Sequence, residues 1–556
     1  MECAEVSSAP QEVPKSPVHH PRDQAIATVI DFEAARARAT SQRQFARETG
    51  VPRTTLQRWL AAKERLHDDP GVVAFFESPS GLRFLHRLEV ALLLVMTLVG
   101  ACGLRHVSLV FRLVGLARWI ACSEGTTRKV SAALEQAVVA FGATEQTRLA
   151  KTMPSRTITA CEDETFHPAP CLVAIEPVSN FILLEQYASG RDASNWNTAM
   201  TEALIGLPVT IEQVTSDEAS GLRKHVREGL GAQPSPDLFH VQYELSRGTA
   251  SRLAAQLRQT EVAHQQAQQT LAKRAVDMRA SKVAKARRAV EKTAAALHEA
   301  QTRRQGVQEA IRALGHAYHP FDLQIGTKRD ATIVEAALRE QFTVIEAHVK
   351  QAALSEKGFA RIAKAARVVP AMVATIAWVH RTITARVHAL RLTAAVTDLL
   401  HTHIIPGLYL QRVAARAATA EARAALHAQA TNLLAVLHDP TGVWTALAPG
   451  IRAQTLRTAQ ECADLFQRAS SCVEGRNGQL SLHHHHLHRL RSRKLKALTV
   501  IHNFFLRRSD GTTAAERFFG TRPNDLFEHL CAVLPLPARP RIRSRGQPAQ
   551  VLRETG

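Results

Sequence analysis

The sequence lacks the signals that would place it among secreted, membrane-spanning or ATP-using proteins. Its eight cysteines include no pair at C-x-x-C spacing, so neither a zinc ribbon nor a thioredoxin-like motif is indicated. Because no secretory signal is evident, we expect reduced thiols in a cytoplasmic protein. The apolar run 90–104 covers 15 residues, whereas a bilayer needs about 20, so we expect a buried core helix and no membrane association. No glycine-rich phosphate loop is present to support an ATP-driven function.

Acidic residues are scarce relative to basic ones. The chain has 70 Lys and Arg against 50 Asp and Glu, which gives a net charge of +20. This balance favours a polyanionic partner, because each neutralised phosphate releases condensed counterions. DNA, RNA and an anionic membrane surface would each fit, so the charge narrows the class of partner without naming it. At 556 residues the chain should form about two to four domains.

The stretch 155–243 has the pattern of an α/β core. Short β-rich runs precede and alternate with two amphipathic stretches, at 193–205 and 218–230. The β-rich runs lie at 157–161, 171–175, 181–187, 211–215 and 238–241. Three strands joined by short connections, followed by helix, strand, helix and strand, is the order of a ribonuclease H-like core. We therefore expect a mixed five-stranded sheet covered by helices.

The stretch 244–465 predicts a large all-α insertion into this core. Residues 244–315 are rich in Ala, Gln, Arg and Lys and contain no proline, which is typical of a long helix or an antiparallel helical hairpin. Its basic residues are candidates for contacting DNA phosphates or for pairing two protomers; they include Arg279, Lys282, Lys285, Arg287, Arg288 and Lys292. Interspersed acids such as Glu291 favour dimerisation or structural support.

The segment 41–63, SQRQFARETGVPRTTLQRWLAAK, predicts two short helices joined by a tight turn. Ser41 suits the cap of the first helix and Gly50 suits the turn, while Leu56 and Trp59 fall on one inner face of the second helix. This pattern resembles a helix-turn-helix, whose second helix would present polar side chains to the major groove of DNA. Those side chains are Arg53, Thr54, Gln57 and Arg58. An ordinary helical hairpin would have the same apolar spacing.

Three acidic residues in separate strings are candidates for one catalytic site. Asp163 follows the first β-rich run in TITACEDETF, Asp217 follows the fourth in IEQVTSDEASG, and Glu474 begins a helical pattern in SSCVEGRNGQLS. Two carboxylates at strand ends and one on a distant helix provide the hard oxygen ligands of a pair of divalent cations. A single Asp after a strand is more often a cap or turn residue. Other acids that compete for these roles are Glu162, Glu164, Asp237 and Glu516.

The ordered set resembles the DDE transposases of bacterial insertion sequences, especially those with a long helical insertion before the final glutamate. The strings that carry the resemblance are DETF, LLEQYASGRDASNW, TSDEASGL, PDLFHV and VEGRNG. The resemblance implies that Asp163, Asp217 and Glu474 bind two Mg²⁺ or Mn²⁺ ions and catalyse DNA cleavage and strand transfer through 3′-hydroxyl ends. It also implies that Arg476 and Asn477 position the glutamate or contact DNA.

The same resemblance implies the partners and the location. We expect double-stranded DNA, both the terminal repeats of the element and the target, a homodimer, and a bacterial nucleoid-associated protein in the cytoplasm. The alternatives are a catalytically inactive, transposase-derived DNA-binding protein, a metal-dependent nuclease without strand transfer, and a helical scaffolding protein.

The expected organisation has seven segments. They are a disordered tail at 1–24, a helix-turn-helix DNA-binding domain at 25–67, a helical domain at 68–150, the first part of the catalytic core at 155–243, the helical insertion at 244–465, the final catalytic helix with C-terminal helices at 466–534, and a basic extended tail at 535–556. Within the sixth segment, His484 and His488 of the run HHHHLH share a helical face. No nearby cysteine or acid pair completes a zinc site, so we expect this face to contact the DNA backbone or solvent.

Overall fold

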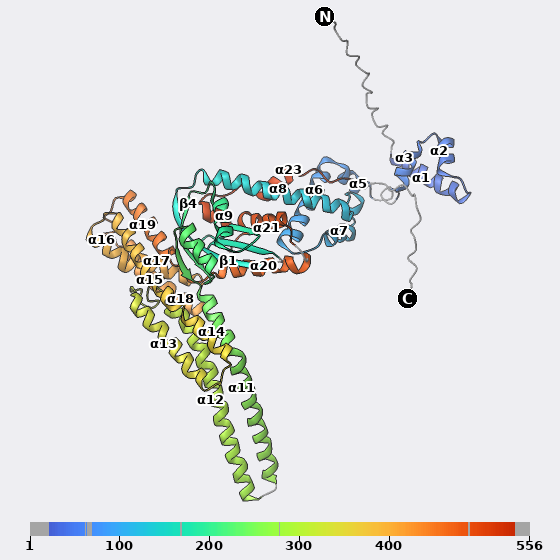
Figure 1. Ribbon diagram of the computed structural model, residues 1–556. Coiled ribbons are helices and arrows are strands. Elements are labelled where there is room, and N and C mark those ends of the chain that lie inside the picture. Colours follow the sequence, from blue (N-terminus) through green and yellow to red (C-terminus); the bar gives the residue numbers. More distant parts are fainter. Residues whose placement is uncertain are drawn as a thin grey trace. The chain divides into compact units, whose positions relative to one another are not determined.

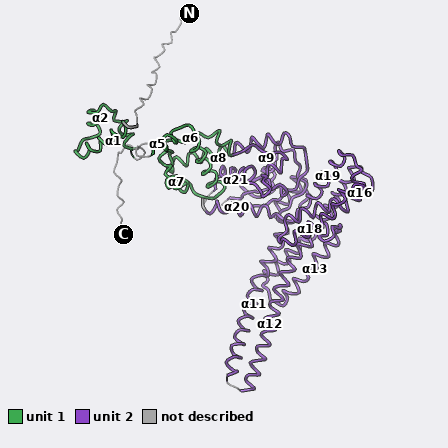
Figure 2. The backbone as a smooth tube through the Cα atoms, turned by 180° about the vertical axis from the view of Figure 1, so that it is seen from behind, with its two compact units in different colours: residues 1–137, 527–556 green, residues 138–526 purple. Residues whose placement is uncertain are grey.

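The computed structural model describes residues 22–61, 63, 69–166, 169–276, 279–487 and 490–539. The chain divides into two compact units, one of residues 1–137 with 527–556 and the other of residues 138–526 (Figure 2). The described residues are mostly helical and contain one mixed five-stranded sheet, as expected. The tails predicted at 1–24 and 535–556 lie mainly outside the described residues.

The first three helices of unit 1 enclose a small hydrophobic cluster. They are α1 (Arg22–Ala37), α2 (Gln42–Thr49) and α3 (Arg53–Ala61). Phe32 and Phe45 meet edge to face with 5.2 Å between ring centroids, and Leu56 is fully buried beside them. Ser41 caps α2 by accepting a hydrogen bond from the Gln44 amide, and Gly50 ends that helix at φ 69°. The predicted cap, turn and inner face of this segment are therefore confirmed.

The rest of the described part of unit 1 is also helical. Its elements are α5 (Pro70–Glu77), α6 (Pro79–Leu94), the π-helix η1 (Val95–Val99), α7 (Leu104–Leu113), the 3₁₀ turn η2 (Leu116–Arg118) and α23 (Leu526–Val533), and α8 (Glu124–Ala150) runs from this unit into unit 2. Leu93, Leu94 and Leu98 are buried. This burial confirms that the apolar run 90–104 contributes a core helix.

Glu89 on α6 is a buried acid that should make the stability of unit 1 depend on pH. It is 4% exposed, and burial raises its pKa from 4.5 to about 7. The folded state therefore holds this proton more tightly than the unfolded chain, so stability is full below pH 4.5 and falls as the pH rises towards 7. We expect Glu89→Gln to raise stability at pH 8 by up to about 3 kcal/mol and to have little effect at pH 4. Thermal denaturation at both pH values, beside the exposed control Glu48→Gln, measures this, and an unchanged pH dependence in Glu89→Gln would contradict it.

The sheet of unit 2 has the strand order β3-β2-β1-β4-β5. The strands are β1 (Arg156–Phe166), β2 (Pro170–Glu176), β3 (Phe181–Tyr187), β4 (Val209–Ser216) and β5 (Gln233–Pro236). β1 pairs antiparallel with β2, and β2 with β3, whereas β4 pairs parallel with β1 and β5 parallel with β4. Four of the five predicted strands are confirmed. The fifth prediction was wrong, because residues 238–241 begin a helix and the fifth strand is Gln233–Pro236.

Helices cover both faces of this sheet. On one side, α9 (Ala193–Leu204), α10 (Ser220–Lys224) and the π-helix η3 (His225–Gly229) follow the predicted amphipathic stretches. On the other side, α20 (Ser471–Leu487) packs on β1 and β2, and α21 (Ser492–Phe504) packs on β3, followed by α22 (Ala514–Phe519). Successive side chains of a strand point to opposite faces, so each β1 residue has one of these two environments.

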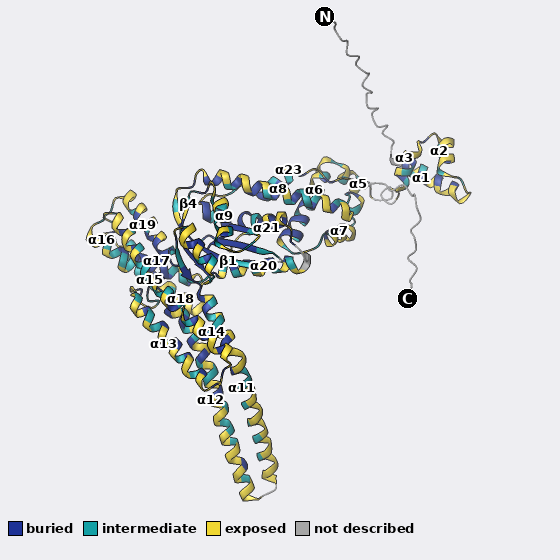
Figure 3. Ribbon diagram, in the orientation of Figure 1, coloured by how far each residue is buried: buried dark blue, intermediate teal, exposed yellow. Residues whose placement is uncertain are grey.

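Between β5 and α20 the chain forms an all-α insertion, as predicted. Its elements are α11 (Leu238–Val276), α12 (Ala280–Ala317), α13 (Ala331–Lys350), α14 (Glu356–Ala366), α15 (Val369–Ala389), α16 (Ala394–Leu399), η4 (Leu400–Ile404), α17 (Ile405–Ala414), α18 (Ala420–Leu434), η5 (Ala435–Leu437) and α19 (Pro449–Asp464). The predicted hairpin is α11 with α12, which projects from the rest of unit 2 (Figure 1). Its outer part is largely exposed (Figure 3).

One helical stretch in the described residues, Glu356–Ala389, is long and apolar enough by composition to cross a membrane. It consists of α14 and α15, and Ile376, Val379 and Ile383 of α15 are buried in the hydrophobic core of the insertion. Core helices of soluble proteins have this composition too, and the burial agrees with such a role.

Candidate metal centre

Asp163 and Asp217 come from neighbouring parallel strands. β1 and β4 pair with Cys161 opposite Thr215, and each aspartate is two residues farther along its own strand direction. Asp163 is still within β1, opposite Val173 of β2, whereas Asp217 directly follows β4. The two aspartates therefore lie side by side near the carboxyl ends of β1 and β4, as the sequence predicted.

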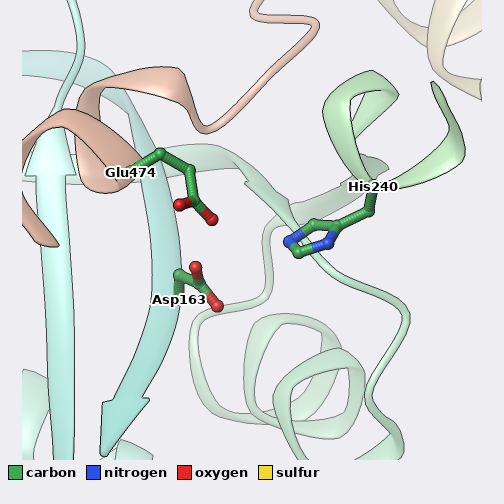
Figure 4. Close-up of side chains that lie close together, drawn as sticks. All are labelled: Asp163, His240 and Glu474. Carbon is green, nitrogen blue, oxygen red and sulfur yellow. The ribbon is translucent and has the colours of Figure 1, made fainter. Parts of the chain in front are cut away.

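Glu474 reaches the same place from the first turn of α20. This helix packs on β1 and β2. One side-chain ligand atom each from Asp163, Glu474 and His240 lies within 4.8 Å of the other two. Figure 4 shows the two carboxyl groups facing each other with the His240 ring directed towards them. Glu474, which follows the helical insertion, thus lies beside Asp163 of β1, although 310 residues lie between them in the sequence.

His240 belongs to the first turn of α11, and sequence analysis did not identify it as a ligand. Asp237 directly precedes α11 and His240 lies within that helix, so neither residue belongs to the fifth strand. The Nε2 atom of His240 is buried without a hydrogen-bond partner among the described residues and lies 3.7 Å from Oδ2 of Asp237. A buried imidazole nitrogen beside two carboxylates is suited to bind a cation. The string PDLFHV contained a signal for this ligand, because a histidine in the first turn of a helix that directly follows a strand lies close to the end of that strand.

Asp237 joins the elements that carry these side chains. It is 2% exposed, and its Oδ1 accepts a hydrogen bond of 2.7 Å from the Phe239 amide at the start of α11. Its Oδ2 accepts a hydrogen bond from the Ser470 hydroxyl, directly before α20, and its amide donates to the Ser216 carbonyl at the end of β4. Asp237 therefore fixes the starts of α11 and α20 against the end of β4.

The electrostatics of Asp163 favour a bound cation. The pKa of Asp163 is raised to about 7, chiefly by burial; the negative charges of Glu474 and Asp217 contribute to the rise, while the Glu164 amide and His240 oppose it. Carboxylates held this close repel each other unless a proton or a cation lies between them. The donor set of two carboxylates and one imidazole fits Mg²⁺ or Mn²⁺, and the imidazole suits Mn²⁺ better.

Asp217 stands next to this group without being one of its three members. Its Oδ1 accepts a hydrogen bond of 3.0 Å from the Ala219 amide, which is a turn interaction. Its charge acts on the pKa of Asp163. The geometry therefore unites Asp163 and Glu474 with His240 and places the third predicted acid alongside Asp163.

Of the four competing acids, Glu162, Glu164 and Glu516 lie elsewhere, whereas Asp237 lies beside His240. Glu162 and Glu164 point to the opposite face of β1, where Glu162 lies 3.7 Å from His225 and Glu164 accepts a hydrogen bond from the Trp196 indole. Glu516 belongs to the first turn of α22, where its amide bonds to the Thr513 hydroxyl. Alternation along β1 and the position of α20 thus select Asp163 and Glu474 among the acids.

Residues 400–546 match a protein family of unknown function (DUF6399). The matched range contains Glu474 and all of α20, but neither Asp163, Asp217 nor His240. No curated protein and no solved structure matches the chain.

Arg476, which the resemblance predicts to position the glutamate or contact DNA, is buried in an ion pair. Its side chain is 5% exposed, and its Nε and Nη2 donate to the two carboxylate oxygens of Glu185 on β3, each at 2.7 Å. The Thr499 hydroxyl donates a further hydrogen bond to the same carboxylate. This buried ion pair attaches α20 to the sheet one turn from the metal-centre residues. Asn477 is half-buried, and its Oδ1 has no partner among the described residues.

The polar residues of α3 occupy the outer side of the amino-terminal cluster. Arg53, Thr54 and Arg58 are exposed, while Gln57 is half-buried and donates a hydrogen bond of 3.3 Å to Gln42 on α2. Three of the four residues are thus available to a partner as predicted.

The histidine run gives no second candidate site within the described ranges. His483 on α20 is buried, and His488, one of the two residues expected to share a face, lies outside the described residues.

Proposed function

We propose that the chain is a DDE-type transposase in which Asp163, Asp217 and Glu474 act with His240 in divalent-metal-dependent cleavage and joining of DNA strands. The observation that carries the proposal is the meeting of Asp163, Glu474 and His240 within 4.8 Å. Support comes from the strand order, with two antiparallel partners on one side of β1 and two parallel strands on the other, which is the arrangement expected of a ribonuclease H-like core. The match to a family of unknown function neither names nor opposes this activity.

Each side chain has a chemical role in this proposal. Asp163 is affected by the charges of both Asp217 on the next strand and Glu474 on α20, and these three carboxylates would hold the divalent cations together. Divalent cations held there supply Lewis acidity, which orients the attacking hydroxyl and neutralises charge on the reacting phosphate. Asp237 holds the two helix starts in place, so His240 and Glu474 are positioned before substrate arrives.

The partner we propose is double-stranded DNA, both element ends and target. The net charge of +20 favours nucleic acid, and α3 exposes Arg53, Thr54 and Arg58 in the manner of a helix-turn-helix recognition helix. We further propose a bacterial, nucleoid-associated protein that acts as a homodimer, because two DNA ends must be brought together for strand transfer.

Binding of Mn²⁺ tests the metal centre independently of activity. We expect electron paramagnetic resonance titration at pH 8 to show bound Mn²⁺ in the parent protein, and Asp163→Asn to weaken its affinity by about 10- to 100-fold, because the central oxygen ligand loses its charge. Glu164→Gln is the matched control, since it removes an adjacent carboxylate that points to the other face of β1. Equal Mn²⁺ affinity in the parent and Asp163→Asn would contradict the proposed centre.

A joining assay separates the proposed enzyme from its alternatives. The protein would be incubated with Mn²⁺, a target plasmid and labelled fragments of the DNA flanking its gene, cut to expose 3′-hydroxyl ends. Joined products support a transposase, whereas hydrolysis alone indicates a nuclease. Salt-dependent DNA binding with neither product indicates an inactive DNA-binding derivative, and absence of DNA binding would contradict all three.

A further inference from the structure

An arginine-lined cavity lies on the other side of α20 from the candidate metal centre. The cavity has a volume of about 590 Å³, and four arginines contribute to its walls: Arg412, Arg416, Arg468 and Arg508. Cys472, in the first turn of α20, also lines it. Cys472 and Glu474 are two residues apart, which places their side chains on opposite sides of the helix. The cavity is therefore separate from the carboxylate group but shares a helical turn with it.

The positive charge in this cavity is largely uncompensated. Among the described lining residues, Asp464 is the single carboxylate, and it pairs with Arg412 through contacts of 2.6 and 3.2 Å. Arg416 donates to the Gln467 side chain and the Pro177 carbonyl, and these neutral acceptors leave its charge intact. Within the described residues, Arg416, Arg468 and Arg508 thus line the cavity without a direct ion pair to a carboxylate, although the charge of Asp464 interacts with Arg416 and the charges of Asp510 and Glu176 interact with Arg508.

The other two arginines that line the cavity are Arg468 and Arg508. Arg468 donates to the Gly315 carbonyl and, at 2.8 Å, to Nε2 of His319. Burial lowers the pKa of His319 well below its usual value, and nearby arginine charge lowers it further, so the ring is neutral. Arg508 is exposed and lines the cavity, and the charges of Asp510 and Glu176 act on it from nearby. Its five N–H donors are available to a ligand.

We infer that this cavity binds a phosphate group, carried either by a free nucleotide or by a nucleic-acid strand. Guanidinium groups recognise phosphate oxygens by paired, charge-assisted hydrogen bonds. The amino-terminal end of the 17-residue helix α20 adds a favourable dipole at the cavity wall. The volume lies in the range of small-molecule pockets, roughly 300–1,000 Å³, and can hold a mononucleotide. An anion would also relieve the repulsion between Arg416 and its neighbours Arg468 and Arg508. Burial is the largest cause that lowers the pKa of both neighbours, and Arg416 lowers both as well, against the opposing effects of Tyr409 on Arg468 and of Asp510 and Glu176 on Arg508.

The Cys472 thiol provides a readout confined to this cavity. In the full-length protein, the rate of Cys472 alkylation by iodoacetamide would be followed by peptide mass spectrometry, with increasing adenosine monophosphate in one series and a ten-nucleotide single strand in another. A bound phosphate should slow alkylation by excluding the reagent and by reducing the positive potential that favours the thiolate. No metal is added, so the result does not depend on the proposed DNA chemistry.

The matched variants are Arg508→Gln and Arg507→Gln. Both residues are exposed and adjacent in sequence, but of the two only Arg508 lines the cavity. We expect protection in the parent and in Arg507→Gln, with roughly tenfold more ligand needed in Arg508→Gln, because a charge-assisted hydrogen bond is lost. Protection by the single strand alone would identify a nucleic-acid strand as the source of the phosphate, and equal protection by the mononucleotide would identify a free nucleotide. Absence of protection by both ligands in the parent, or equal ligand requirements in the two variants, would overturn the inference.

Discussion

Asp163→Asn should abolish Mn²⁺-dependent nicking of plasmid DNA, lowering the rate by at least about 100- to 1,000-fold. Asparagine keeps the shape of the side chain but removes the charge that would hold a cation between β1 and α20. Glu474→Gln should have a comparable effect for the same reason, because its carboxyl group faces that of Asp163 across the site (Figure 4). The measurement is the initial rate of conversion of supercoiled to relaxed plasmid, with DNA binding followed in parallel by gel shift. We expect binding to persist, since the exposed residues of α3 are unchanged.

The controls for this result come from the acids that competed in the sequence. Glu164→Gln changes a carboxylate on the opposite face of β1, and Glu516→Gln changes one on α22, so both should retain nicking. Loss of activity in Glu516→Gln with full activity in Glu474→Gln would assign the final acid to Glu516. Uniform activity across all four variants would place the reaction outside this group of residues.

The sheet could be predicted from the sequence wherever burial set the pattern. β2 and β3 contain continuous buried apolar runs, and β1 and β4 alternate apolar with β-branched or polar residues along their buried stretches, so local sequence indicates all four strands. β5 was missed because it consists of Gln233–Pro236, a run with two prolines. Proline is tolerated there because β5 pairs with β4 alone and is an edge strand. The apolar residues Leu238 and Val241 looked like a strand but are buried on one face of α11.

The candidate site was predictable in part for a similar reason. Asp163 and Asp217 each come directly after or near the end of a recognisable β-rich run, and the parallel pairing of β1 with β4 brings them together. To predict that His240 belongs to the site, one would have to know that α11 begins directly after β5. The role of Arg476 depends on Glu185, 291 positions earlier in the sequence, and no local pattern reveals such a pair. An exposed arginine near a catalytic glutamate and a buried one look alike in sequence, because burial is set by tertiary packing.

Removing one partner of the buried Arg476–Glu185 pair should be one of the most destabilising single substitutions in unit 2. Removing the guanidinium in Arg476→Met leaves the Glu185 carboxylate buried with the Thr499 hydroxyl as its remaining partner, and breaking such a pair costs about 3–5 kcal/mol. Urea unfolding followed by tryptophan fluorescence would measure the loss. The exposed Arg457→Met is the matched control and should change stability by about 0.5 kcal/mol or less.

A second variant distinguishes a lost ion pair from lost packing. The double variant Arg476→Met with Glu185→Leu removes both charges, and it should recover most of the stability, because no buried charge is then left without a partner. The same comparison tests the DNA contact that the sequence suggested for Arg476. A phosphate contact would reduce the slope of log binding constant against log salt by about one in the folded variant, whereas a buried ion pair predicts an unchanged slope. Full stability of Arg476→Met together with a reduced slope would contradict the buried ion pair and indicate that Arg476 contacts DNA.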